Sequence, residues 1–279
     1  MYNLGDFLSD REIPEEARLY MFKSLNKFPS VEKVIIEARA EKVEEKKLIP
    51  IRDAWNGVIE VGVGLESSDD VIRNLAHRKS VSKATCKKAM ETLNRLGFNS
   101  LSYVNQKPPF LTEQESIDDV VTTTLWAKDI GCMAISIEPT AIQPNTLTEH
   151  LTRLGIYRVP WLYSVVAAVL RITETYKTGE FDLRIGGYFP EELVYGSSSA
   201  GAFPFPTLTS TNCPSCNPKY IQSFARFNET YNPEVLRVLP KCEVCYDTWE
   251  SAIKVKDSRT LPERVFDILG SLDKKEKKE

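Results

Sequence analysis

Hydrophobic positions in the first 175 residues alternate between the spacing of helices and the spacing of strands. Helical spacing covers 14–28, 83–96, 112–131 and 161–176, and Gly97 is placed to end the second of these helices. Short β-rich segments lie between the helices at 31–40, 57–64, 99–106 and 132–138. The segment at 57–64 is a nearly continuous apolar run, which is typical of strands buried on both faces. About five strand–helix units in succession predict an α/β fold with a parallel sheet or a β/α barrel.

The first residues have the pattern of a strand–helix unit entered in its middle. Tyr2 to Phe7 resembles a strand end that runs into a glycine turn, and Asp10 is placed to cap a helix beginning near Pro14. We therefore expect a barrel that lacks its first strand within these 279 residues.

Polar, glycine-bearing or proline-bearing segments follow each predicted strand. They are residues 3–6, 37–39, 62–66, 106–109 and 138–140. Because the carboxyl ends of parallel strands meet at one edge of a sheet or barrel, we expect a functional site there.

Several side chains in these segments have both a functional and an ordinary interpretation. Glu66 is placed either to hold a ribose hydroxyl or substrate amine, or to cap a helix beginning near Ser68. Glu37 and Arg39 face the same way, so they either pair or bind a charged ligand. Lys107, stiffened by two following prolines, is either an anion anchor or a solvated lysine.

The sequence changes character after residue 180 and suggests a division into parts. We expect the incomplete barrel over 1–180, a Gly/Ser/Pro-rich linker over 181–210, a small cysteine-bearing α+β module over 211–270, and a disordered charged tail over 271–279.

Four of the six cysteines form two pairs, each with a two-residue gap. The first pair is Cys213 and Cys216, and the second is Cys242 and Cys245. This spacing favours one closed tetrahedral metal site, most simply structural zinc, in a module too small to have a large core. An iron–sulfur cluster, two disulfides or a redox dithiol are the alternatives. The isolated residues Cys86 and Cys132 fit small core side chains.

Composition excludes little. The net charge is −3, which gives no overall attraction to nucleic acid, although a local basic face stays open. The longest apolar stretch, 159–172, is too short to cross a membrane and predicts a buried helix. Without a secretion leader the expected location is cytoplasmic. His77 and His150 lie in polar helical stretches and are expected at the surface, as are basic residues such as Arg73, Arg78, Lys79, Lys87 and Lys88.

Five segments together resemble the radical S-adenosylmethionine (SAM) enzymes. They are "YNLGDFLSDREIPEEAR", "EVGVGLESSDDVIR", "KPPFLTEQESIDD", "ISIEPTAIQPNTLTEHL" and "YRVPWLYSVV". The resemblance is nearest to the elongator-type core, and within it to the archaeal archaeosine-synthase radical SAM subunits (RaSEA). It implies a partial β/α barrel with SAM lying across the strand ends.

The resemblance also implies a set of cofactor-binding residues. Asn3 and Gly5 match the loop after the family's second strand, with Asp6 in place of the usual small hydroxyl residue. Glu37 and Arg39 match the third-strand "ESR" pattern, with alanine in place of its serine. The remaining matches are Glu66 for the fourth-strand acid, Lys107 for the lysine before the double proline, and Glu138 where relatives often have asparagine.

The family's CxxxCxxC motif, which binds the iron–sulfur cluster, does not occur in these 279 residues. We therefore expect a miscalled start or interrupted gene, a separately encoded N-terminal fragment, or a chain without catalysis. The resemblance implies cleavage of a lysine-conjugated deazaguanine on tRNA in archaeosine biosynthesis, with a lysine-transferring synthase as partner. The alternative is a catalytically inactive, zinc-stapled RNA-binding or assembly protein. No catalytic residue is assigned.

Overall fold

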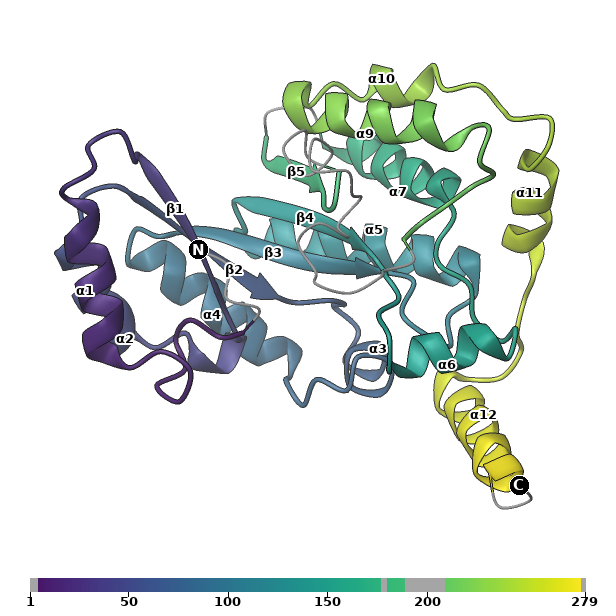
Figure 1. Cartoon of the computed structure of the whole chain (residues 1–279), viewed down its shortest axis with the longest axis horizontal. Helices are drawn as coiled ribbons and strands as arrows, with labels where there is room; N and C mark the ends of the chain where they lie inside the picture. The colour runs from purple at the N-terminus through teal and green to yellow at the C-terminus, as the bar shows by residue number, and fades with distance from the viewer. Residues whose placement is uncertain (1–4, 177–179, 189–208, 277–279) are drawn as a thin grey trace.

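The computed structural model describes residues 5–176, 180–188 and 209–276 and contains a five-stranded parallel sheet (Figure 1). The strands are β1 (Lys33–Ala38), β2 (Val58–Gly64), β3 (Asn99–Gln106), β4 (Ala134–Pro139) and β5 (Asp182–Ile185). Their order in the sheet is their order in the chain, and every neighbouring pair is parallel. Each connection between neighbouring strands includes at least one helix, so the predicted α/β fold is confirmed.

One helix precedes β1, the others connect successive strands, and most of them pack on one face of the sheet. In chain order they are α1 (Glu15–Leu25), η1 (Ala40–Lys42), α2 (Glu45–Ala54), α3 (Asp70–Leu75), α4 (Lys83–Arg95), α5 (Glu113–Asp129), α6 (Leu147–Arg153) and α7 (Leu162–Thr175). Ser82 caps α4, Thr112 and Glu115 form a capping box on α5, and Gly97 follows α4 with a φ of +82°. The helix boundaries therefore follow signals that can be read in the sequence.

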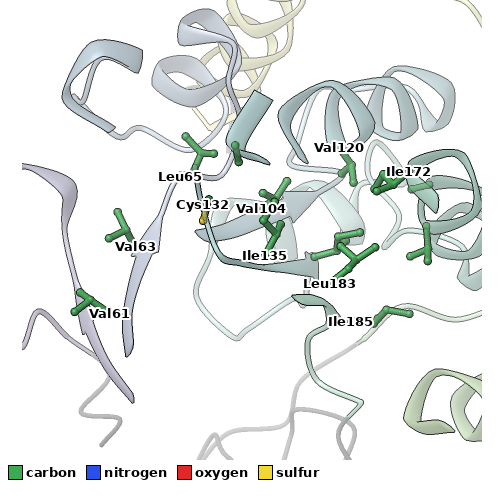
Figure 2. Packing of buried hydrophobic residues seen from close by; sticks show 14 of the residues in the cluster. Val61, Val63, Leu65, Val104, Val120, Cys132, Ile135, Ile172, Leu183 and Ile185 are labelled. Carbon is green, nitrogen blue, oxygen red and sulfur yellow. The ribbon is translucent and has the colours of Figure 1, made fainter. Parts of the chain in front are cut away.

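The main core lies between this face of the sheet and the helices. Figure 2 shows Val63, Val104 and Ile135 of β2, β3 and β4 among its side chains, together with Val120 of α5 and Ile172 of α7. All five are fully buried. The apolar stretch 159–172 forms most of the buried helix α7, as predicted.

The C-terminal residues form helices, the first of which packs on β5 while the last packs near α3, away from β5 (Figure 1). These helices are α9 (Asn217–Thr230), α10 (Glu234–Arg237), α11 (Tyr246–Lys254) and α12 (Leu261–Glu276). Asn228 of α9 accepts a hydrogen bond from the backbone N–H of Ile185 and donates one to its carbonyl, both at 2.8 Å. The outer edge of β5 is thus covered by the module, whose apolar residues belong to the main core.

Several expectations differ from the structure. β5 lies within 181–210, the range expected to be a linker, while 189–208 fall outside the described residues. Described residues of the C-terminal module form helices rather than an α+β unit, and α12 continues to Glu276 within the tail expected to be disordered. Asp10 does not cap α1, whose N-cap is Pro14; instead it pairs with Arg18 at 2.6 Å. The expected strand end at Tyr2 lies outside the described residues.

Candidate functional site

A cavity of about 520 Å³ opens at the carboxyl ends of β1 and β2. This volume is within the range of small-molecule sites. Its lining includes four of the residues predicted to bind a cofactor: Gly5, Glu37, Arg39 and Glu66. Of the other predicted residues that the structure describes, Lys107 and Glu138 are not part of this lining, as described below.

Two glycines keep the cavity wall open. A Cβ atom added at Gly62 would lie 2.7 Å from the ring of Tyr103, and one added at Gly64 would collide with the side chains of Glu66 and Lys79. Because a side chain at Gly62 would collide with the Tyr103 ring, β2 presents bare backbone to the cavity at this position.

Glu66 is held at the cavity by an ion pair with Lys79, whose Nζ also donates to the carbonyl of Gly64 at 3.2 Å. The backbone of Glu66 has a φ of +62°, which is costly for a residue with a side chain and is characteristic of functional sites. The helix-capping interpretation of Glu66 is wrong. Asp69 is the N-cap of α3, because its side chain accepts from the N–H groups of Val71 and Ile72.

Arg39 and Glu37 do not pair with each other. Arg39 pairs with the buried carboxylate of Asp6 at 2.9 Å, which fixes the loop before α1 against the end of β1. The N–H of Phe7 also donates to the carbonyl of Glu37 at 2.8 Å. Burial raises the pKa of the Glu37 carboxyl. The cavity lining therefore carries three glutamates, Glu37, Glu41 and Glu66, and its positive charge comes from Arg39, Arg78 and Lys79.

Lys107 and Glu138 lie at the same edge of the sheet but face different surroundings. Lys107 follows β3 with a φ of +60° and forms a buried ion pair with Glu113 at the start of α5. Burial lowers the pKa of the Lys107 amine. Glu138 accepts a hydrogen bond from Ser136 at 2.6 Å and packs against Gly186. Asn3 lies outside the described residues.

Glu113 is the main site residue that sequence reasoning missed. It accepts from the N–H of Trp161 at 3.0 Å and from the hydroxyl of Ser164 at 2.6 Å, besides its pair with Lys107. In the sequence it looks like an ordinary acid in the first turn of a helix. Its two partners from the "PWLYS" segment, 48 and 51 residues away, become neighbours only through the fold.

The four paired cysteines converge as predicted. The Sγ atoms of Cys213 and Cys216, of Cys213 and Cys242, and of Cys216 and Cys245 are each 3.6 Å apart, and all four lie within 4.8 Å of one another. Tetrahedral zinc–thiolate bonds of about 2.3 Å separate their sulfurs by about 3.8 Å. The four-cysteine site therefore has the dimensions of a single-ion centre, whereas a multi-iron cluster would hold the sulfurs farther apart.

The four-cysteine site is attached to the barrel through Tyr163 of α7. The Tyr163 hydroxyl lies 3.3 Å from the Sγ of Cys245 and accepts a hydrogen bond from the N–H of Cys242 at 3.3 Å. Cys86 and Cys132 are each 1% exposed in the core, which confirms their predicted structural role.

Two surface predictions are wrong. His77 is half-buried rather than exposed, and burial lowers its pKa to about 4. Arg73 is completely buried and donates hydrogen bonds to the carbonyls of Ser67 and Val81, so it is not available to RNA. Arg78 is exposed at the cavity.

Comparison with known proteins relates the geometry to a family. No protein-family model matches the chain. An uncharacterized protein of Methanocaldococcus jannaschii, MJ0550, is 29% identical over 262 residues, which cover 94% of this chain and 67% of that protein. Archaeosine synthase subunit beta of Methanosarcina acetivorans is 29% identical over 258 residues, or 92% of this chain and 69% of the relative. The chain is homologous to archaeosine synthase subunit beta.

A solved structure shows the same fold. Elp3 of Methanocaldococcus infernus, with its N-terminus deleted, aligns with a TM-score of 0.52 at 13% identity, over 78% of this chain and 46% of that one. The partial radical SAM-type barrel expected from the sequence is thereby confirmed. The subunit beta homologue of Methanosarcina acetivorans is longer than these 279 residues, and this chain covers about two thirds of its length. Among the described residues, no helix is long and apolar enough to cross a membrane.

Proposed function

We propose that this chain is the SAM-binding part of a radical SAM enzyme that modifies tRNA in archaeosine biosynthesis. The observation that carries the proposal is the strand-end cavity, where Glu37, Arg39 and Glu66 meet beside the bare backbone of β2. The homologue's name supplies the modification, and the shared barrel supports the cofactor class.

The cavity residues suit the chemical groups of SAM. Glu66 and Glu37 are acceptors for ribose hydroxyls or the methionine amine, and the Arg39 guanidinium, already fixed by Asp6, complements a carboxylate. When bound and reduced by an iron–sulfur cluster, SAM supplies the radical used by enzymes of this class. The chain's own contribution is to bind and orient the cofactor.

The cysteines of this chain do not fit the cluster's position. No cysteine is among the described residues that line the strand-end cavity, and the convergent four lie in the C-terminal module. We propose that the cluster ligands come from polypeptide outside these residues, either upstream in the same protein or in a separate fragment. We assign the four-cysteine site to structural zinc.

We also propose a substrate and a partner for this enzyme. We propose that the substrate is a tRNA carrying a lysine-conjugated deazaguanine precursor, which is cleaved to the formamidine product. A lysine-transferring archaeosine synthase is the proposed partner, in keeping with the homologue's designation as a beta subunit. A cytoplasmic location is part of the same proposal. The second candidate, a zinc-stapled RNA-binding protein without catalysis, is favoured only by the missing CxxxCxxC motif.

Calorimetric titration of the purified chain with SAM separates the two candidates. The SAM-binding function predicts saturable binding at one site, competed by S-adenosylhomocysteine but not by ATP. Absence of binding by both the chain and its assembly with a cluster-bearing fragment would overturn the proposal and favour the RNA-binding candidate.

A further inference from the structure

A chain of buried polar contacts joins the strand-end edge of the barrel to the four-cysteine module. We call it the relay; its members are Lys107, Glu113, Ser164 and Trp249. Lys107 follows β3, Glu113 begins α5, Ser164 lies in α7 and Trp249 lies in α11. The relay therefore crosses three helices from the barrel edge to the module.

The middle of the relay is a carboxylate that has no freedom to move. Glu113 is 4% exposed, and one of its oxygens accepts from both Ser164 and the backbone N–H of Trp161 while the other faces Lys107. Burying a charge is costly unless its partners are fixed. The position of the Lys107 amine is therefore determined by whatever holds Glu113.

The far end of the relay depends on the module. The indole N–H of Trp249 donates to the Ser164 hydroxyl at 2.9 Å, which leaves that hydroxyl hydrogen free to be donated to Glu113. α11 carries Trp249 and begins immediately after Cys245. Tyr163, next to Ser164 in the chain, contacts the same cysteine. The four-cysteine site thus adjoins both residues of the Ser164–Trp249 contact, Trp249 through α11 and Ser164 through its neighbour Tyr163.

We propose that Glu113 is a positioning residue through which the metal-loaded module holds the amine of Lys107 at the barrel edge. Loss of the metal loosens α11, removes the indole donor from Ser164, and releases Glu113 and Lys107 in turn. The four-cysteine site is then a control point for the strand-end site as well as a staple. Only the use of Lys107 in ligand binding rests on the proposed function; the coupling itself does not.

Amine labelling tests the coupling without SAM or activity. The zinc-reconstituted full chain and the same chain stripped with a chelator are pulsed with acetic anhydride, and acetylation of each lysine is followed by mass spectrometry. Stripping is expected to raise the Lys107 rate about tenfold, as for loss of a hydrogen bond to a charged group. Ser164→Ala is expected to raise it equally in the loaded chain, with no further increase on stripping.

Two controls separate coupling from general loosening. Thr173→Ala removes another hydroxyl of α7, one that donates only to the carbonyl of Leu170, and should leave the Lys107 rate unchanged. Lys47, also about 10% exposed and paired with Asp10, reports on the other end of the barrel. The proposal is overturned if stripping does not change Lys107, if stripping and Ser164→Ala act additively, or if Lys47 rises in parallel.

Discussion

Arg184 of β5 and Glu60 of β2 form an ion pair at 2.8 Å across the concave face of the sheet, over two intervening strands. Glu60 is 2% exposed and also pairs with Lys33 of β1 at 2.6 Å, while Arg184 pairs with Asp182 as well. These charges line the interior of the barrel and connect its first and last described strands.

This pair makes a prediction about stability. Arg184→Met should lower the free energy of unfolding by about 3 kcal/mol, because it leaves Glu60 buried with one partner fewer. Arg171→Met, which breaks a half-exposed pair with Asp118, should cost less than about 1 kcal/mol. Urea denaturation of both variants measures the difference, and equal losses would show that the interior pair does not hold the barrel closed.

The four-cysteine site makes a prediction about metal content. The purified chain should hold one zinc ion, and Cys245→Ser should lose it, because three thiolates leave the tetrahedral site open. Cys86→Ala, a change in the main core, should keep the ion. Elemental analysis measures the metal content of each protein. Full zinc content in Cys245→Ser would contradict a site shared by the four cysteines, and iron instead of zinc in the unaltered chain would contradict the assignment to zinc.

Glu66 makes a prediction about ligand affinity. Glu66→Gln should weaken SAM binding about tenfold, because a carboxylate acceptor at the cavity becomes a neutral amide. The matched control is Glu91→Gln on the outside of α4, where the carboxylate pairs with Lys87 at 3.8 Å. Calorimetry should give unchanged affinity for the control. Unchanged affinity in both variants would place the cofactor elsewhere.

His77 makes a prediction about pH. Its pKa is about 4 in the folded chain and near 6.5 when unfolded, so the unfolded state takes up a proton first as the pH falls. His77 should therefore remove about 2 kcal/mol of stability between pH 7 and pH 5. His77→Gln should be less sensitive to pH by that amount in urea denaturation. An identical pH profile would show that the ring is solvated.

Much of the fold could be predicted from local patterns, but β5 could not. β2 is a nearly continuous apolar run, whereas β5 is only four residues long and alternates Leu183 and Ile185 with the charged residues Asp182 and Arg184. Those charges are tolerated inside the barrel only because Glu60, more than 120 residues earlier, pairs with Arg184. A partner so distant in the sequence cannot be inferred from the residues around β5.

The site was predictable in its location and less so in the direction of its side chains. The segments that follow the strands correctly predicted that Glu37 and Glu66 line the cavity, because the carboxyl ends of parallel strands lie at one edge of a sheet. The left-handed backbone at Lys107, which places its amine beside Glu113, has no signal in a Lys-Pro-Pro sequence. Likewise, burial of Arg73 depends on carbonyls in the loops on either side of α3 rather than on helix periodicity.

Formation of 5′-deoxyadenosine tests the central claim most directly. The chain is co-expressed with an upstream fragment bearing CxxxCxxC, and the complex is reconstituted with iron and sulfide, reduced, and supplied with SAM and tRNA carrying the lysine-conjugated base. The account predicts a brown complex that cleaves SAM and converts the tRNA, with Glu66→Gln impaired in both. A colourless complex that leaves SAM intact would contradict it.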